Sequence, residues 1–263
     1  MPPTLQFIES LARQAGKVIK AGYNQRPGFG SKLHVQSKGI VDIVSEIDFQ
    51  VEKLVMDAIR ENFPGDSIVS EESGFLDEKD CCIWYVDPLD GTINYVHGLP
   101  FFCVSLAYTE EGIVKLGVVY DPIRDECFSA ERGNGATLNG EPIRVSNANR
   151  LIESLLVTGF SYDIRENDEN NLDKFSRLSM RARSIRRLGS AALDLCYVAA
   201  GRLDGYWELD IHPWDFAAGA LIASAAGASV IDFHGKPDLF TSPHTLMVCT
   251  PGIEKEMLEV LNI

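Results

Sequence analysis

Apolar side chains recur at helical spacing in the first sixty residues. Over residues 4–22 they return every three or four positions, which predicts an amphipathic helix. Residues 25–39 are polar with three glycines and predict a loop. Ser45, followed by Asp48 three positions later, is typical of a capping box. This pair predicts the start of a second helix, which ends before Phe63-Pro64-Gly65.

The pattern then changes to short apolar runs between turn residues. Residues 67–70 form one run, which ends at the carboxylate pair Glu71-Glu72. The run that begins at Trp84 predicts a buried strand that breaks sharply at Asp87-Pro88. Turn signals then separate further runs between residues 101 and 145, which predicts an antiparallel meander. These runs cover residues 102–108, 113–120 and 126–131.

Beyond residue 150 the pattern alternates between strand-like and helix-like segments. The strands are expected at 155–158, 184–187, 206–209, 229–232 and 246–249, and the helices at 168–181, 190–200, 215–226 and 252–262. The chain therefore divides into an α+β half, about residues 1–150, and an α/β half, about residues 151–263, with helices and sheets in layers.

Composition narrows the class of protein. The formal net charge is −14, and no basic block stands out beyond Arg181 to Arg187, which argues against direct binding of nucleic acid through phosphate neutralisation. The longest uncharged run, Phe216 to Ile231, is too short to span a membrane. The first residues do not resemble a secretory signal. Six cysteines without C-x-x-C spacing favour a reducing, cytoplasmic compartment and make a zinc site unlikely.

Carboxylates follow several of the predicted strands or open the predicted helices. Each one alone is more often a helix cap or a surface acid. Asp87 and Asp90, however, lie three residues apart across a proline-stiffened turn, so both can face one point. Gly91 permits close backbone approach, and a helix that begins there would offer amides to an anion. Metal ions held by carboxylates beside an anion site indicate phosphoryl chemistry.

Other chemistries fit the sequence less well. A phospho-aspartate mechanism needs D-x-D, whereas two residues separate Asp87 from Asp90. The sequence contains neither a P-loop nor a G-x-S-x-G nucleophile motif. The acids are spread over the chain and not grouped in one EF-hand loop. His97 and His212 lie near the acidic motifs and are interpreted as structural.

In four motifs the sequence resembles the inositol monophosphatase superfamily of Mg²⁺-dependent, lithium-sensitive phosphatases. The motifs occur in the family's order and extend the resemblance over essentially the whole chain. They are Asp42-Ile-Val-Ser-Glu-Ile-Asp48, Ser70-Glu-Glu-Ser73, Asp87-Pro-Leu-Asp-Gly-Thr92 and Trp214-Asp-Phe-Ala-Ala-Gly219. The resemblance implies a single catalytic domain, residues 1–263, with the layered αβαβα sandwich of inositol monophosphatase and fructose-1,6-bisphosphatase.

The resemblance also implies roles for the acidic residues. Glu71, Asp87 and the carbonyl of Leu89 would hold one Mg²⁺, while Asp87, Asp90 and Asp215 would hold a second; the family binds two to three ions per subunit. The pair Asp48–Thr92 would polarise the attacking water, together with Glu71. The backbone amides of Gly91 and Thr92 would receive the phosphate.

Substrate contacts follow from weaker matches. Ser190, Ala191 and Glu208 match positions that touch sugar or inositol hydroxyls, although Glu208 also suits an ordinary salt bridge. Arg187 would reach either the substrate or a subunit interface. Lys38 matches a lysine near the metals, in a loop that is one residue shorter than in animal enzymes. The family also implies a homodimer.

The substrate expected from the resemblance is myo-inositol monophosphate. Fructose 1,6-bisphosphate or dual specificity is the first alternative, and nucleotide 3′-phosphates and histidinol phosphate come next. An alternative of another class is a regulatory binding partner with secondary catalysis.

Overall fold

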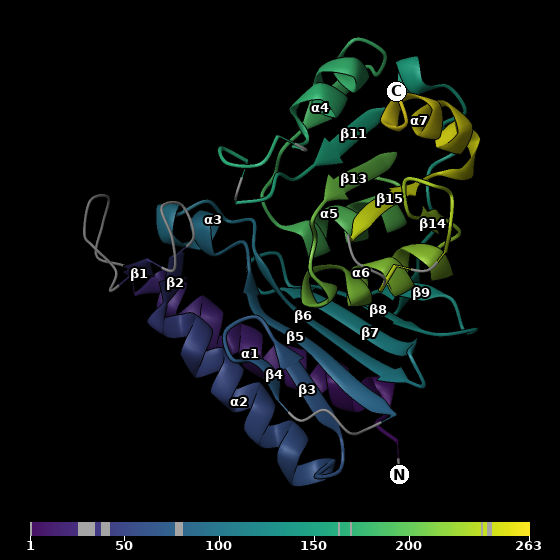
Figure 1. Ribbon diagram of the computed structural model, residues 1–263. Helices are drawn as coiled ribbons and strands as arrows, with labels where there is room; N and C mark the ends of the chain where they lie inside the picture. Colours follow the sequence, from purple (N-terminus) through teal and green to yellow (C-terminus); the bar gives the residue numbers. More distant parts are fainter. Residues whose placement is uncertain are drawn as a thin grey trace.

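The computed structural model describes residues 2–25, 35–37, 43–76, 81–162, 164–168, 170–237, 239–240 and 244–263. These residues form five stacked layers in the order helix, sheet, helix, sheet, helix (Figure 1). The predicted αβαβα sandwich is therefore confirmed. Among the described residues, no helix is long and apolar enough to cross a membrane.

The larger sheet has eight strands in the order β10-β9-β8-β7-β6-β5-β3-β4. Its neighbours are antiparallel except for β3 and β5, so the predicted meander forms most of the sheet. The strands are β3 Ser67–Ser70, β4 Gly74–Leu76, β5 Cys82–Asp90, β6 Cys103–Glu110, β7 Ile113–Asp121, β8 Glu126–Glu131, β9 Ala136–Leu138 and β10 Glu141–Pro142. A separate ribbon pairs β1 Val35–Ser37 with β2 Ile43–Ser45.

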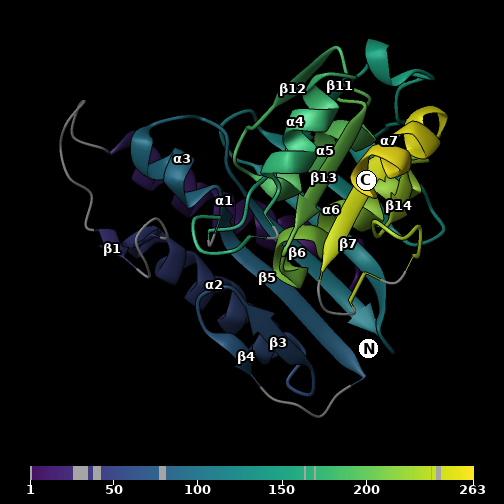
Figure 2. The same ribbon diagram turned by 45° about the horizontal axis from the view of Figure 1, so that its top comes forward.

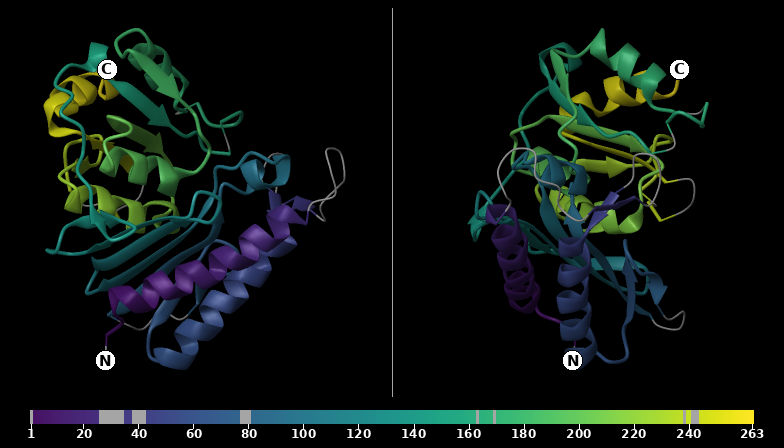
Figure 3. Two further views of the ribbon diagram at one scale, coloured as in Figure 1. Left: turned by 180° about the vertical axis from the view of Figure 1, so that it is seen from behind. Right: turned by 90° about the vertical axis from the view of Figure 1, so that its left-hand side faces the viewer.

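Helices α1 Leu5–Asn24 and α2 Glu46–Asn62 cover the outer face of the larger sheet (Figure 3). The hydroxyl of Thr4 caps α1 by accepting a hydrogen bond from the amide of Phe7 at 3.2 Å. The apolar stripes of both helices are buried, as the helical spacing predicted. Gly16 lets α1 approach the sheet, because a Cβ there would lie 2.4 Å from the ring of Tyr120.

The smaller sheet has five strands in the order β12-β11-β13-β15-β14. Strand β11 is parallel to β12 and β13, whereas β15 runs antiparallel to β13 and β14. The strands are β11 Leu155–Thr158, β12 Ser184–Arg186, β13 Gly205–Leu209, β14 Ser229–Ile231 and β15 Thr245–Cys249. Helices α4 Leu172–Ser179 and α7 Glu254–Leu261 cover its outer face (Figure 2).

The middle layer consists of α5 Ala191–Ala199 and α6 Pro213–Ala225. Helix α6 is apolar on all sides because it lies between two sheets. Its small side chains allow close packing: a Cβ on Gly117 of β7 would lie 3.0 Å from the backbone of Ala218. Two helices from the C-terminal part of the chain therefore pack on the sheet built by the N-terminal part.

Several predicted boundaries are wrong. Strand β5 does not break at Asp87-Pro88 but continues to Asp90, with a register shift between Asp87 and Asp90. A bulge absorbs the missing proline N–H without ending the strand. Helix α4 is shorter than residues 168–181, and α6 begins two residues before Asp215 because Pro213 suits the first turn of a helix. Short 3₁₀ turns, Leu151–Glu153 and Pro251–Ile253, precede β11 and α7.

Candidate active site

The end of β5 places two carboxylates in the interior of the protein. Asp87 is 1% exposed and Asp90 is 9% exposed. The amide of Leu89 donates to Asp87 Oδ1 at 3.0 Å across the bulge. Gly91 follows with φ 93° and starts the short helix α3, Thr92–His97, as the sequence predicted. A side chain at Gly91 would be strained by this backbone conformation and would lie 3.0 Å from the carbonyl oxygen of Phe101.

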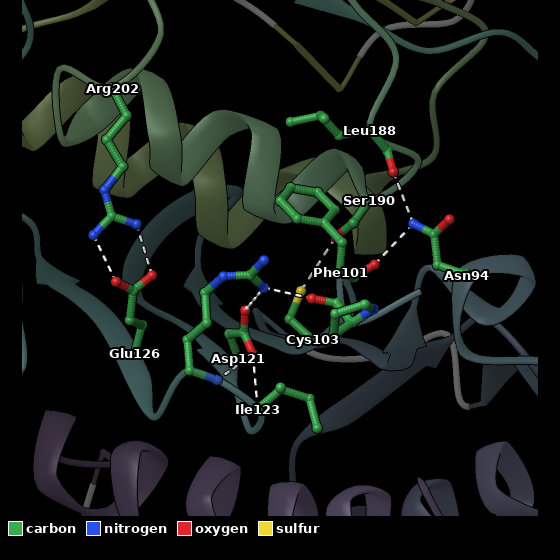
Figure 4. Close-up of polar contacts among 11 residues, drawn as sticks. Asn94, Phe101, Cys103, Asp121, Ile123, Glu126, Leu188, Ser190 and Arg202 are labelled. Atoms are coloured by element: carbon green, nitrogen blue, oxygen red, sulfur yellow. Dashed lines mark hydrogen bonds and ion pairs between the residues drawn. The ribbon is translucent and has the colours of Figure 1, made fainter. Parts of the chain in front are cut away.

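The Asp90 carboxylate is held by residues at the start of α5, which belongs to the C-terminal part of the chain. Its Oδ2 accepts a hydrogen bond from the hydroxyl of Ser190 at 2.6 Å and from the amide of Ala192 at 2.8 Å. The thiol of Cys103 lies 3.7 Å from the same oxygen and 3.6 Å from Ser190 Oγ. Figure 4 shows Cys103 on the sheet pointing at Ser190 below the helix. Both layers thus fix the orientation of one carboxylate.

The boundary between the two layers is held by further polar contacts. The amide of Asn94 donates to the carbonyl oxygens of Phe101 at 2.8 Å and Leu188 at 2.7 Å (Figure 4). Farther from the cavity, Arg202 forms a two-pronged ion pair with Glu126, at 2.7 and 2.6 Å. The Asn94 contacts tie the segment before α5 to α3 and to the segment after it, which keeps Ser190 in place beside Asp90.

Asp48 and Thr92 meet through a buried hydrogen bond. The hydroxyl of Thr92 lies 2.9 Å from Asp48 Oδ1 and 2.9 Å from the carbonyl oxygen of Leu89. It carries one proton, so these two acceptors compete for it. Asp48 lies in α2 and is fully buried. The predicted pair is therefore formed by residues 44 positions apart in sequence.

Glu71 and Asp215 come to the same cavity from other elements. Glu71 follows β3, and its amide donates to the carbonyl of Val86 at 3.2 Å. Asp215 lies in the first turn of α6, where its Oδ2 accepts from the amide of His212 at 3.0 Å. His212 caps the helix and its ring stacks on Trp214 with centroids 4.6 Å apart. Asp215 is therefore not the N-cap residue but the third residue of the helix, and its side chain completes the capping box.

A cavity of about 380 Å³ joins these groups. Eleven of the twelve predicted site residues line it, and Asp48 reaches it through Thr92. The eleven are Glu71, Asp87, Leu89, Asp90, Gly91, Thr92, Arg187, Ser190, Ala191, Glu208 and Asp215. Lys38 lies outside the described residues.

Burial and mutual repulsion dominate the electrostatics of the carboxylate cluster, by which we mean Glu71, Asp87, Asp90 and Asp215. Burial raises the pKa of Asp87 and of Asp215 well above the usual range, and the charge of Glu71 raises both further. Burial also raises the pKa of Asp90 to about 6, although its hydrogen bond from Ser190 acts in the opposite direction. Such crowding is unfavourable unless cations neutralise it.

The donor set of the carboxylate cluster fits hard divalent cations. It consists of carboxylate oxygens and one backbone carbonyl, which are the ligands that Mg²⁺ prefers. Hydrogen bonds engage Asp87 Oδ1 and Asp215 Oδ2, while the second oxygen of each accepts none from the described residues. Within the described part of the chain, no three of these side chains converge closely enough to enclose an ion.

Comparison with known proteins identifies the family. The model of the inositol monophosphatase family matches residues 1–262. The chain belongs to the inositol monophosphatase family. It is 44% identical over 263 residues to the Nus factor SuhB of Pasteurella multocida, covering 100% of this chain and 97% of that protein.

Two solved structures share both the fold and much of the sequence. The inositol monophosphatase from Anabaena superposes with a TM-score of 0.86 at 38% identity, covering 98% of this chain and 96% of that one. The Thermotoga maritima IMPase gives a TM-score of 0.86 at 41% identity, with the same coverage. The expected family membership is thus confirmed.

In this member of the inositol monophosphatase family, further residues line the cavity besides those predicted from the sequence. We use the name C-terminal wall for five of the residues that line the cavity from the C-terminal half of the chain: Gly159, Arg187, Ser190, Asp194 and Glu208. Gly159 and Asp194 were missed. An aspartate in the otherwise uncharged helix α5 was the available signal for Asp194, whereas nothing local in the sequence marks Gly159.

Glu208 is held in the C-terminal wall by two neighbouring elements. Its carboxylate accepts a hydrogen bond from the hydroxyl of Tyr206. A Cβ on Gly159 would lie 2.1 Å from Glu208 Oε2, so only glycine leaves room for the carboxylate there. Burial raises the pKa of Glu208 to about 7, against the effect of the Tyr206 hydrogen bond. Arg187 stands over the ring of Phe160 at 5.3 Å.

Proposed function

We propose that this protein is a Mg²⁺-dependent phosphomonoesterase that hydrolyses myo-inositol monophosphate to inositol and phosphate. One observation carries the proposal: carboxylates from β5, α6 and the turn after β3 share a cavity with the buried Asp48–Thr92 pair. In this reading the whole chain, residues 1–263, is a single catalytic domain.

The proposed metal ligands are Glu71, Asp87, the carbonyl of Leu89, Asp90 and Asp215, for two to three Mg²⁺ ions. When bound, Mg²⁺ neutralises phosphate charge and lowers the pKa of water. The pKa values support this, since carboxylates crowded at this depth are stabilised as anions by adjacent cations. The hydrogen bonds to Asp90 Oδ2 would fix which oxygen faces the ions.

The attacking water would be oriented by residues of the chain. Thr92 Oγ1 lies 2.9 Å from Asp48 Oδ1. In the proposed mechanism Asp48 accepts the hydrogen bond from this hydroxyl, and the lone pairs of Thr92 Oγ1 accept one from the water. Glu71 is proposed to accept a hydrogen bond from the same water. The backbone amides of Gly91 and Thr92, at the start of α3, would hold the phosphate oxygens. Phosphate leaves without a covalent bond to the protein.

The alcohol half of the substrate would lie against the C-terminal wall. Glu208, Ser190 and Ala191 line the cavity and supply acceptors and a hydroxyl for a sugar or polyol. Arg187, an exposed cation on the same cavity, suits a second phosphate. This placement keeps fructose 1,6-bisphosphate as the first alternative substrate, ahead of nucleotide 3′-phosphates and histidinol phosphate.

A regulatory function is the second candidate. The name of the relative from Pasteurella multocida, Nus factor SuhB, does not refer to an enzymatic activity. Because the net charge of −14 disfavours direct nucleic-acid contact, the partner in this alternative would be a protein. A homodimer is proposed under either function.

A substrate panel tests the proposal. Phosphate release would be measured at fixed Mg²⁺ from myo-inositol 1-phosphate, fructose 1,6-bisphosphate, a nucleoside 3′-phosphate and histidinol phosphate, with and without millimolar Li⁺. We expect the highest kcat/KM for the inositol phosphate and inhibition by Li⁺. A higher kcat/KM for another compound would change the proposed substrate but not the proposed phosphatase function. Absence of turnover on the whole panel, with a stoichiometric protein partner recovered from lysate, would favour the regulatory function.

A further inference from the structure

The carboxyl group of Asp194 has one buried oxygen without a hydrogen-bond partner in the described part of the chain. It lies in α5 and is 1% exposed. Its Oδ1 is buried and accepts no hydrogen bond from the described residues. Its neighbours Leu193 and Leu195 are fully buried in the apolar core. A polar group in this position destabilises the ligand-free protein, because it loses its contact with water and gains no partner.

The same side chain lines the cavity. Burial first, and then the charges of Asp90 and Glu208, raise the pKa of Asp194 well above the usual range. Asp194 therefore shares the cavity with a proposed metal ligand, Asp90, and with the proposed acceptor for the substrate alcohol, Glu208. A group at this place can find its missing partner in a molecule that enters the cavity.

The neighbouring carboxyl shows which kind of partner fits. Glu208 pairs with the hydroxyl of Tyr206, so this part of the cavity already joins a carboxyl to a hydroxyl. A hydroxyl both donates and accepts, and it therefore suits Asp194 whether that carboxyl is ionised or protonated. The alcohol half of a polyol phosphate carries several hydroxyls on adjacent carbons.

We propose that Asp194 and Glu208 bind neighbouring hydroxyls of the substrate alcohol, so that Asp194 is a specificity-determining residue for polyol phosphates. The proposal rests on the proposed phosphatase function. It assigns the unpartnered carboxyl a hydrogen bond that forms only in the complex. Removal of the side chain therefore costs discrimination between alcohols but no stability.

The test compares Asp194→Ala with Asp194→Asn on two substrates. Myo-inositol 1-phosphate carries the hydroxyls, and phenyl phosphate lacks them. In the alanine variant the ratio of kcat/KM for the first substrate over the second falls about tenfold, as expected for one hydrogen bond to a carboxyl group. The asparagine variant recovers most of the ratio, because an amide also donates and accepts. Asp210→Asn, on an exposed acid of the same cavity, keeps the wild-type ratio.

Two further readouts separate this role from a structural one. The Tm of the ligand-free Asp194→Ala protein stays at or above the wild-type value, and the Mg²⁺ concentration for half-maximal rate is unchanged. A lower Tm, or equal losses on both substrates, would overturn the proposal. If the wild type hydrolyses neither substrate, the phosphatase function fails and calorimetry with myo-inositol decides: weaker binding to the alanine variant supports the role of Asp194, and equal or absent binding refutes it.

Discussion

The carboxylate cluster and the C-terminal wall face the same cavity but are built in different ways. In the cluster, Asp87 and Asp215 accept hydrogen bonds from the nearby amides of Leu89 and His212. Asp90 accepts hydrogen bonds from Ser190 and Ala192 at the start of α5. In the wall, Glu208 lies against Gly159, which directly follows β11, and Asp194 has an oxygen with no partner among the described residues. These three carboxylates of the cluster therefore have hydrogen-bond partners within the protein, whereas in our proposal the wall gains its missing partner from the ligand.

The largest effect is expected from Asp90→Asn in the carboxylate cluster. The amide oxygen can keep the hydrogen bonds from Ser190 and Ala192, so the fold is retained while one negative charge is lost. Weaker metal binding should lower kcat at least about 10³-fold, since metal assistance is worth several kcal/mol. Phosphate release measures this. The same substitution at Asp57, an exposed acid of α2, is the control and should leave kcat unchanged. A near-normal rate for Asp90→Asn would refute the proposed metal site.

Thr92→Val tests the buried pair at the junction of the two regions. Valine has a similar shape but no hydroxyl, so Asp48 loses the group through which it would act on water. We expect kcat to fall about 10²-fold, at the lower end for proton transfer by a positioned group. Thr109→Val provides the control, because Thr109 is also buried, lies in β6, and donates its hydroxyl to the carbonyl oxygen of Ile83. It should cost about 1 kcal/mol of stability and no activity.

Gly159→Ala tests the wall and should have a smaller, substrate-selective effect. The new methyl group displaces the Glu208 carboxylate, from which it would lie 2.1 Å. The KM for myo-inositol 1-phosphate should rise about tenfold, as for loss of one hydrogen bond to a charged group. Gly65→Ala, where a Cβ meets open space, is the control. Equal effects of both substitutions in steady-state kinetics would remove Glu208 from the substrate site.

The smallest expected effect is a pH dependence of stability in metal-free protein. Glu208 holds its proton up to about pH 7 when folded, whereas its usual pKa is 4.5. Between these values the native state binds more protons, so the free energy of unfolding falls as pH rises through this window. Urea unfolding with EDTA at pH 5 and pH 7.5 should show a smaller fall for Glu208→Gln than for wild type. Parallel changes would contradict the raised pKa.

The sequence predicted elements that follow a local pattern of apolar residues, but not contacts between residues far apart in the chain. Regular spacing of apolar residues was enough for α1, which buries one face. Apolar runs bounded by turn residues were enough for the meander and for most strands of the smaller sheet. The layered fold itself was predicted from four motifs by resemblance. The break at Asp87-Pro88 was predicted wrongly, since the sequence does not reveal that Cys103 pairs with Asp90 beyond the bulge.

The residues of the candidate site also divide into those that the local sequence predicts and those that it does not. Asp87, Leu89, Asp90, Gly91 and Thr92 are consecutive or nearly so, and their local geometry follows from a proline, a bulge and a left-handed glycine. The role of Gly159 depends on Glu208, which lies 49 residues further along the chain. The pKa of Asp194 depends in part on Asp90, which lies 104 residues before it. Such interactions between distant residues arise when the chain packs, and they leave no pattern in the local sequence.

The proposed Mg²⁺-dependent phosphatase function can be tested by measuring phosphate release from myo-inositol 1-phosphate. The protein is first stripped with EDTA and then titrated with Mg²⁺. We predict no detectable release before Mg²⁺ is added and a saturable rise afterwards, which Asp90→Asn abolishes or shifts to much higher Mg²⁺. Release that is independent of Mg²⁺, or no release at any Mg²⁺ concentration, would contradict the account.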